Sequence, residues 1–587
     1  MNSDPEKTLI PARAHPQSTL PRLRFPFICL LVFWVATFAV QQVDKQYFQA
    51  FFFSLGSSGL FTILFLGWWF FNKALTRRDK LTGFLFLLVE AILVGKTADK
   101  TVNFITLWSV GFPLVATVVV LVFFLAKKYP IRIRPVFAIC TTITWSLFLL
   151  FRTNGVDSTL KADLHWRWTP TAEQIFLSQN KGNGTHPVQF SASSHTARSP
   201  LDWPEFRGTN RDGVIHGSAI ATNWTSNPPA LVWKKKVGPG WSSMSIVKGN
   251  LFTQEQRGEK EVTVCYDASS GQQIWVHEET ARFEEPVSGP GPRATPTWSN
   301  DRIYSLGGTG ILTCLNATNG QAFWVADIKK DSGAPTPIWA FSSSPLILGN
   351  KAIVYAGGTQ GKSILAYDIN TGKVVWSAAG GASSYSSAQA ATIDGVQQCL
   401  MLHDGGLTSL DPTTGKVIWE MGSGWKGAPR CGQPQVVDGD SLVVGSLDGP
   451  GTTRLKVSKS GEKCSVAPTW VTKDLKPEFP DFVVSGNYAY GFDVSMFTCI
   501  NLKDGKRAWK EGRYGRGQVV LLADQQLLLI TSETGELALL GVDPVQHQEL
   551  GRFQAIEGKT WAHAVVQGDK IFLRNSEEMA CYVSKNK

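Results

Sequence analysis

The second half of this chain repeats one short pattern five times: Asp or Asn, three residues, Gly, three residues, Trp. An Asp or Asn at a strand end bonds to its own backbone, and Gly accepts the positive φ of a tight turn. The pattern therefore predicts a hairpin turn followed by a strand that carries the Trp. The five copies are Asp267/Gly271/Trp275, Asn316/Gly320/Trp324, Asp368/Gly372/Trp376, Asp411/Gly415/Trp419 and Asn501/Gly505/Trp509.

The spacing of the copies predicts the architecture. Successive Trp residues lie 49, 52, 43 and 90 positions apart, the last gap being two units long. Repeats of about 40–50 residues with several short strands are typical of a β-propeller. Three degraded copies follow from Asp440 to Trp470, from Asp524 to Phe553 and from Trp561 to Val583. The last lacks one strand, which the segment beginning at Ala230 can supply by closing the ring. We expect eight blades over residues 230–583.

The repeated Trp and Cys residues have a structural interpretation. A Trp between neighbouring blades buries on the order of 200 Å² and stabilises the packing by several kcal/mol. Cys265, Cys314, Cys499 and Cys581 occupy the slot that Ala366 and Ser409 fill in other repeats. Cysteines in one slot of different blades lie too far apart to form disulfides.

Charge and composition divide the chain near residue 153. Residues 1–160 hold 16 Lys/Arg against 7 Asp/Glu, which accounts for a surplus of 9 in the total net charge of +10. A nucleic-acid-binding role needs its positive charge on the folded soluble part. That part is almost neutral, so this role is excluded.

Five apolar stretches, at about 25–43, 47–71, 81–95, 103–126 and 135–151, predict five membrane spans after a basic cytoplasmic tail, residues 1–24. Lys and Arg number four, one, four, two and four in the tail and the successive loops. This alternation predicts a cytoplasmic amino terminus and an extracytoplasmic propeller. If the third, shortest stretch did not span, the propeller would be cytoplasmic.

The third stretch contains Glu90. An ionisable group within a membrane can mark an ion or quinone path. We favour the alternative that it lies near a helix end or packs against a neighbouring span. The transmembrane domain is thus predicted over 25–152, a polar linker with little fixed structure over 153–200, and a lead-in segment over 201–229.

The turn motif, best seen in Ala366–Trp376, resembles the pyrroloquinoline-quinone (PQQ) repeat. That repeat implies the eight-bladed propeller of quinoprotein dehydrogenases and of non-catalytic relatives such as the propeller lipoprotein of outer-membrane assembly. Trp203–Gly213 is similar to the lead-in of bacterial PQQ-like propellers. Five spans followed by an outward propeller resemble membrane-bound quinoprotein glucose dehydrogenases.

The chain departs from the dehydrogenases in three respects. About 355 residues for eight blades, roughly 44 per blade, is close to the minimum for four strands and leaves little room for a cofactor chamber. The adjacent Cys-Cys pair of the alcohol dehydrogenases is missing, and a Glu/Asn/Asp calcium set is not evident. We therefore expect no cofactor, with PQQ and calcium as the alternative.

The residues that begin each inner strand predict a ligand-binding channel mouth. In register they are Trp241, Arg293, Trp339, Tyr385, Arg430, Asp481, Arg516 and either Trp561 or His563. Arg suits carboxylates or phosphates, and aromatic rings suit stacking. PQQ, a flat tricarboxylate, would fit, with Asp481 as the candidate base. An acidic peptide or an anionic polymer would fit equally well. Alternatively, the Arg residues pair with Asp481 and turn carbonyls while the aromatic residues plug the channel.

The resulting prediction is a multi-pass protein of the cytoplasmic membrane whose periplasmic propeller acts as a binding or scaffold module of the bacterial envelope. Its partner would be an envelope protein, an anionic polymer or a small ligand. The alternative is a PQQ-dependent oxidoreductase that passes electrons from an alcohol or sugar to membrane quinone, with the spans as the docking site. We lean towards a non-enzymatic role.

Overall fold

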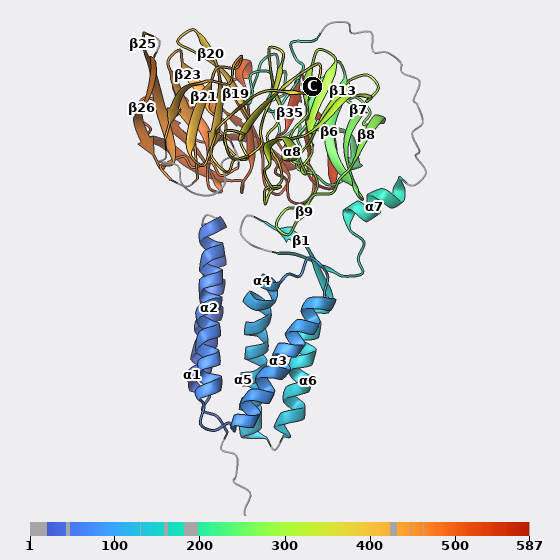
Figure 1. The fold of residues 1–587 in the computed structure, drawn as a ribbon, viewed down its shortest axis with the longest axis vertical. Helices are drawn as coiled ribbons and strands as arrows, with labels where there is room; N and C mark the ends of the chain where they lie inside the picture. The colour runs from blue at the N-terminus through green and yellow to red at the C-terminus, as the bar shows by residue number, and fades with distance from the viewer. Residues whose placement is uncertain are drawn as a thin grey trace, which may run out of the picture. The chain divides into compact units, whose positions relative to one another are not determined.

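A computed structural model describes residues 20–42, 47–129, 131–157, 162–180, 198–422, 431–447, 449–461, 463–479 and 481–585. The chain divides into two compact units, Met1–Thr169 and Pro170–Lys587. The first is mainly helical, and the second is an eight-bladed propeller (Figure 1).

Helices form over all five apolar stretches. Their bounds are α1 Arg24–Gln42, α2 Tyr47–Phe71, α3 Arg77–Thr97, α4 Phe104–Thr106 with the π-helical η1 Leu107–Gly111 and α5 Phe112–Lys128, and α6 Ile133–Ser146 with η2 Leu147–Leu149. Among the described residues, two helices are long and apolar enough to cross a membrane, Phe51–Phe71 and Phe104–Lys128. The sequence predicts five spans, and only two of the described helices meet the length and apolarity of a span. The other apolar helices are shorter, and α3 carries six charged residues.

The carboxyl group of Glu90 packs between helices. Its side chain is buried on α3, and Thr142 of α6 donates a hydrogen bond to it. This contact agrees with the interpretation of Glu90 as a packing residue against a neighbouring helix.

The polar segment after the helices has more structure than its composition suggests. It contains the hairpin β1 Phe151–Val156/β2 Ala162–Trp166 and the helix α7 Ala172–Gln179. Thr171 and Gln174 form a capping box at the start of α7. Glu173 then pairs with Arg282 at 3.0 Å, which docks α7 on the first blade. The expectation of little fixed structure over 153–200 is therefore wrong for the part that the structure describes, because short local signals decide it rather than average polarity.

Each blade is a four-stranded antiparallel meander. The first four blades are β5 Ser245–Val247, β6 Asn250–Arg257, β7 Lys260–Asp267, β8 Gln273–Thr280; β11 Thr297–Ser299, β12 Arg302–Leu306, β13 Ile311–Asn316, β14 Ala322–Asp327; β15 Leu346–Leu348, β16 Lys351–Tyr355, β17 Ile364–Asp368, β18 Val374–Ala378; and β19 Gln389–Ile393, β20 Val396–His403, β21 Gly406–Leu410, β22 Val417–Met421. Small additions are the hairpin β9 Glu284–Glu285/β10 Gly289–Pro290 and the helix α8 Ile328–Ser332.

The other four blades include the degraded copies. They are β23 Gln435–Asp438, β24 Ser441–Val444, β25 Thr452–Ser460, β26 Lys463–Thr472; β27 Val483–Ser485, β28 Tyr488–Asp493, β29 Met496–Asn501, β30 Arg507–Arg513; β31 Gln518–Leu522, β32 Leu527–Thr531, β33 Glu536–Gly541, β34 Gln548–Gln554; and β35 Val565–Gln567, β36 Lys570–Arg574, β37 Glu578–Val583, β4 Ala230–Lys236. In the seventh blade, β3 Val214–Ile215 pairs in parallel with β31, which η3 Ala523–Gln525 follows.

The ring closes as predicted. β4 pairs antiparallel with β37, so the first strand of the propeller completes the last blade. The count of eight blades from the sequence is confirmed.

The repeated motif forms an interlock between neighbouring blades. In five blade pairs, the indole of a Trp lies against the turn glycine of the next blade, and its N–H donates to the backbone oxygen that follows the motif Asp or Asn. The Trp419 indole instead donates to Gln398 at 2.8 Å, and the Trp509 indole donates to the backbone oxygen of Asp543 at 2.9 Å. For Trp324, the ring lies on Gly372 and the N–H donates to Ile369 at 2.9 Å. The equivalent pairs are Trp233 with Gly271, Trp275 with Gly320, Trp376 with Gly415 and Trp470 with Gly505. The structural interpretation of the Trp residues is thus confirmed.

The cysteine slot lies opposite the Trp across each blade. Cys314 pairs with Trp324 in register, as Ala366 does with Trp376. A small residue here leaves room for the indole. All nine cysteines are free, in agreement with the expectation that this slot forms no disulfide.

Candidate functional site at the propeller mouth

A belt of hydrogen bonds at the start of the inner strands establishes the blade register. The backbone N–H of one blade donates to a side chain of the next: Ser243 to Thr295 at 3.2 Å, Thr295 to Ser344 at 2.9 Å, Ser344 to Ser387 at 2.8 Å and Gln433 to Asp481 at 3.0 Å. With the Gln433 amide turned to satisfy its neighbours, it accepts from Ser387 at 2.9 Å. Equivalent positions on six blades are thereby aligned.

This alignment changes the predicted mouth at three positions and decides a fourth. In the third and fifth blades, the residues two before the belt are Ser342 and Cys431 rather than Trp339 and Arg430. Asp481 belongs to the belt, and Phe479, two residues earlier, occupies the slot equivalent to Trp241. His563 is also at belt level, where its backbone oxygen accepts from Ser243 Oγ at 2.7 Å. Trp561 therefore takes the mouth position. Glycine and proline around these residues obscure the register in the sequence, so counting from the turns drifts by one to three residues.

Five aromatic side chains, Trp241, Trp339, Tyr385, Phe479 and Trp561, form what we call the aromatic mouth. The Trp561 ring lies 4.8 Å from that of Trp241 and 5.1 Å from that of Phe479, centroid to centroid. The Lys559 ammonium lies over both indoles, at 5.3 Å from Trp241 and 4.6 Å from Trp561. Trp339 and Tyr385 form a second pair at 5.4 Å. Trp241 is buried and the other four are half-buried. Burial raises the pKa of Tyr385 to about 12, so its hydroxyl stays protonated.

Arg293 holds a short hairpin at the mouth. Its guanidinium contacts Glu285 at 3.0 Å and Ser288 at 2.6 Å, both in the β9/β10 hairpin, and lies over the Phe283 ring. Trp241 donates its indole N–H to the backbone oxygen of Ser288 at 2.9 Å. The side chain of Arg293 is therefore engaged within the protein. The sequence analysis did not predict this hairpin, because its strands are only two residues long and carry no alternating apolar pattern, although Ser288-Gly289 is a turn pair.

The other charged candidates are also paired. Arg516 contacts Glu478 at 2.5 Å, with both side chains buried. Asp481 pairs with Arg207 of the lead-in segment at 2.9 Å, again buried. Burial raises the pKa of the Asp481 carboxyl, and the Arg207 charge opposes that shift. Arg430 lies outside the described residues.

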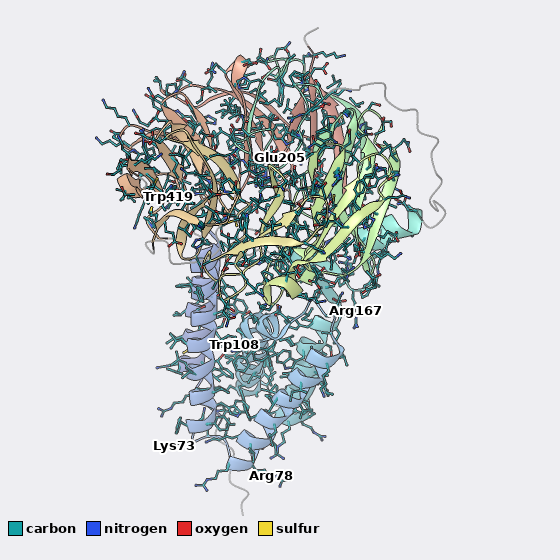
Figure 2. The ribbon with its side chains drawn as sticks, turned by 45° about the horizontal axis from the view of Figure 1, so that its top comes forward. Lys73, Arg78, Trp108, Arg167, Glu205 and Trp419 are labelled. Carbon is teal, nitrogen blue, oxygen red and sulfur yellow. The ribbon has the colours of Figure 1, made fainter. Side chains whose placement is uncertain are left out.

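The lead-in segment lies inside the channel. Its backbone pairs with the inner strands at Ile246 and, through Pro204, at Trp298. Arg207 donates to the backbone oxygen of Phe482 at 2.7 Å, and Arg211 donates to that of Ser344 at 2.9 Å. Contacts with the far ends of inner strands show that the segment closes the channel from the end opposite the mouth. Glu205 of this segment appears at the centre of the ring in Figure 2.

His563 lies where the lead-in segment meets the belt. Its ring packs edge-on against Phe206 at 5.2 Å, and it is buried. Burial and the nearby Arg207 charge lower its pKa to about 3, so it is neutral. This residue has the environment of a core side chain rather than of a ligand contact.

The mouth residues do not fit PQQ. Arg293 and Arg516, the expected carboxylate partners, are bound to buried glutamates, and Asp481 is bound to Arg207. The contact between Trp241 and Trp561 leaves no gap for a flat ring between them. Among the residues that the structure describes, no group of three or more His, Cys, Asp and Glu side chains could hold a metal ion. What the arrangement offers is a half-buried aromatic surface around internally neutralised charges.

Comparisons with known proteins find similarity to the two kinds of protein that the repeat motif resembles, an outer-membrane assembly factor and quinoprotein dehydrogenases. A family model described as outer membrane protein assembly factor BamB matches residues 258–511. Quinohemoprotein alcohol dehydrogenase ADH IIB of Pseudomonas putida is 27% identical over 119 residues, 19% of this chain and 16% of that protein. BamB of Shewanella oneidensis is 23% identical over 158 residues, 25% of this chain and 36% of that protein. The matched regions are thus well under half the length of these curated relatives.

Solved structures of a BamB and of a quinohemoprotein alcohol dehydrogenase are also similar to this chain. BamB from Moraxella catarrhalis has a TM-score of 0.45 and 16% identity, covering 60% of this chain and 99% of that one. Quinohemoprotein alcohol dehydrogenase from Comamonas testosteroni has a TM-score of 0.40 and 12% identity, covering 67% and 82%. The second unit is an eight-bladed propeller, and over residues 258–511 its repeats are similar to those of the matched family model.

Proposed function

We propose that this chain is a membrane-anchored binding module of the bacterial envelope, and that its propeller takes up a protein partner at the aromatic mouth. The observation that carries the proposal is the combination of half-buried aromatic rings with charged groups that are already paired. Binding energy at protein interfaces concentrates on Trp, Tyr and similar anchors in largely desolvated surroundings. Because Arg293 and Arg516 are neutralised internally, the mouth suits a protein segment with apolar side chains better than an anionic polymer.

Anchoring is proposed from the helical unit. Two helices have the length and apolarity of spans, and three further helices cover the remaining apolar stretches. Alternating Lys and Arg content of the loops supports five crossings, a cytoplasmic amino terminus and a periplasmic propeller. The match to an outer membrane protein assembly factor supports an envelope role without identifying the partner.

The alternative, a PQQ-dependent oxidoreductase, is supported by the match to a quinohemoprotein dehydrogenase. It requires Arg293 or Arg516 to exchange a glutamate for a cofactor carboxylate. Titration of the purified full-length chain with PQQ and calcium separates the two proposals. Saturable quenching of Trp fluorescence, lost in Arg293→Ala, would favour the oxidoreductase.

The binding proposal is tested by photo-crosslinking of the full-length chain in its host. A photoreactive amino acid replaces Ile338, which is 75% exposed beside Trp339. The matched control replaces Val545, which is 82% exposed on a turn between the third and fourth strands of the seventh blade. In a four-stranded meander, that turn lies on the face opposite the mouth.

We expect one discrete crosslinked envelope protein from position 338 and none from position 545. Trp339→Ala together with Tyr385→Ala should weaken this crosslink about tenfold or more, the usual effect of removing interface anchors. Equal products from both positions, or a product unchanged in the double variant, would contradict the proposal.

A further inference from the structure

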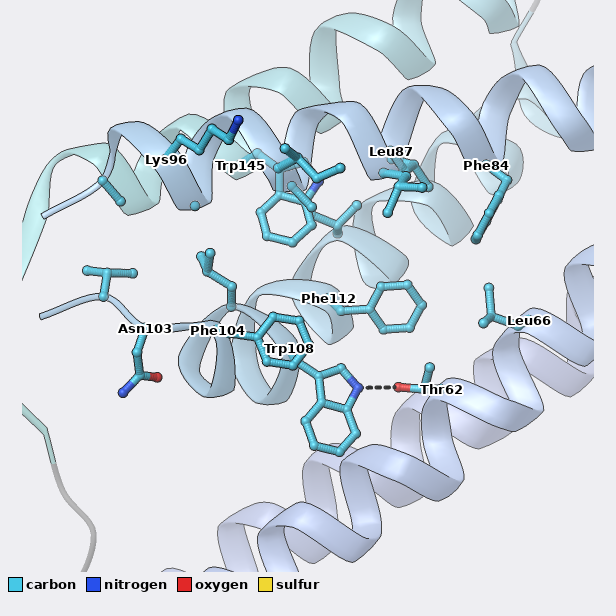
Figure 3. Close-up of a pocket in the computed structure, with 18 of the residues that line it drawn as sticks. Thr62, Leu66, Phe84, Leu87, Lys96, Asn103, Phe104, Trp108, Phe112 and Trp145 are labelled. Atoms are coloured by element: carbon cyan, nitrogen blue, oxygen red, sulfur yellow. Dashed lines mark hydrogen bonds between the residues drawn. The ribbon is translucent and has the colours of Figure 1, made fainter. Parts of the chain in front are cut away.

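The helical unit contains a cavity of about 690 Å³ between α2, α3 and α5 (Figure 3). Its volume falls in the range of about 300–1,000 Å³ that is usual for small-molecule sites. Most of the lining is apolar, including Leu66, Phe84, Leu87 and Phe112. Its walls belong to the first compact unit alone.

A π-turn shapes one wall of the cavity. Pro113 has no N–H to donate to the oxygen of Ser109, and the helix widens over Leu107–Gly111 just before it. The freed oxygen of Ser109 accepts from Ser58 at 3.5 Å. Trp108 projects from this turn and donates to Thr62 at 3.1 Å, as the dashed line in Figure 3 shows. Turns of this type occur often at functional sites.

One end of the cavity is polar and carries more positive than negative charge. Lys96, Asp99 and Lys100 come from the carboxyl end of α3 and the loop after it. The carboxylate of Asp99 accepts from the backbone and the hydroxyl of Thr101, which satisfies it locally. Helix Phe104–Lys128 begins at the same end, and the positive end of its dipole adds to the field of the two lysines. This end therefore suits an anionic group.

Trp145 of α6 closes one wall of the cavity. It is 3% exposed, so its indole adds to the apolar lining.

We propose that this cavity binds an anionic glycerophospholipid. One acyl chain would lie along the apolar walls, and the phosphate would lie at Lys96 and Lys100. An anionic head group and an apolar chain match the charged end and the apolar walls. The inference rests on the proposed membrane anchoring of the helical unit.

The test is native mass spectrometry of the full-length chain, extracted from membranes in an uncharged detergent and offered phosphatidylglycerol or phosphatidylcholine with identical chains. Ala91→Phe places a ring in the cavity, since Ala91 lines it. Ile63→Phe is the matched control, since Ile63 of α2 is 70% exposed and does not line the cavity. Lys96→Gln removes one charge at the polar end, and Lys73→Gln removes a lysine outside the lining.

We expect one retained phosphatidylglycerol per chain, reduced about tenfold in Ala91→Phe and unchanged in Ile63→Phe. Lys96→Gln should weaken phosphatidylglycerol retention about fivefold and leave phosphatidylcholine unaffected, as expected for one lysine near an anionic lipid. Equal retention in Ala91→Phe and the wild type would overturn the proposal, as would retention of a neutral isoprenoid quinone in place of phospholipid. A chain that remains in the aqueous fraction would instead refute the anchoring itself.

Discussion

At the residue scale, the most informative side chain is a neutral histidine in the channel. His563 is buried against Phe206 and close to the Arg207 charge, and its pKa falls from 6.5 to about 3. In the unfolded chain the same imidazole takes up a proton near its ordinary pKa. Below about pH 6.5 the unfolded state therefore binds more protons at this position, and the folded state loses stability as the pH falls.

His563→Phe keeps the ring contact with Phe206 and removes the titrating group. Between pH 7 and pH 5, the wild type should lose about 2 kcal/mol of unfolding free energy relative to this variant, since one proton corresponds to about 1.4 kcal/mol per pH unit. Urea unfolding of the detergent-solubilised full chain at both pH values measures the difference. His216→Gln, at an exposed histidine, is the control. Parallel pH profiles of wild type and His563→Phe would show that the histidine is not held neutral.

At the element scale, the turn glycines do two things at once. Gly372 has φ +67°, and a Cβ there would lie 2.6 Å from the Trp324 indole. Gly395 has φ +73° but open space around its Cβ position. The two positions therefore separate backbone strain from the loss of Trp packing between blades.

Gly395→Ala should cost about 1–2 kcal/mol, the usual cost of an L-residue in the left-handed region. Gly372→Ala should cost a further ~1–3 kcal/mol, because the methyl group displaces the Trp324 ring from its packed position. Thermal melting of the two variants gives the comparison. Equal losses would mean that the glycine is needed for its φ alone and that the interlock adds nothing.

At the scale of the whole molecule, the propeller depends on a contact between its two ends. Ala230 pairs with Val583 across β4 and β37, so an early strand completes the last blade. A covalent link there should stabilise the propeller by reducing the freedom of the unfolded ring, by about 2–4 kcal/mol.

The double variant Ala230→Cys/Val583→Cys tests this closure. Directly opposed residues of an antiparallel pair lie within the span of a disulfide. Melting of the propeller should shift upward under oxidising conditions and return when the disulfide is reduced. Ala230→Cys alone is the control. An oxidised double variant that melts like the reduced one would argue that the ring does not open at this seam during unfolding.

The features that the sequence predicts correctly are those encoded by residues close together in the chain, and the features it misses depend on contacts between distant residues. Each blade turn is encoded within a few residues, so Asp411, Gly415 and Trp419 report their own local structure. Repetition of this local signal predicts the blade count and the closing strand. The short lead-in contacts, by contrast, carry no periodic signal, and the mouth register drifted by two residues at Asp481.

By itself, the sequence determined the propeller, its eight blades, the Trp packing and the apolar character of the amino-terminal stretches, because local turn chemistry and hydrophobicity suffice for each. Only the tertiary structure decided what the charged candidates do. Arg207 and Asp481 lie 274 positions apart in sequence, and their pairing follows from the lead-in segment entering the channel. The role of a charged side chain depends on the partner that folding brings to it, and that partner is not encoded near it in the chain.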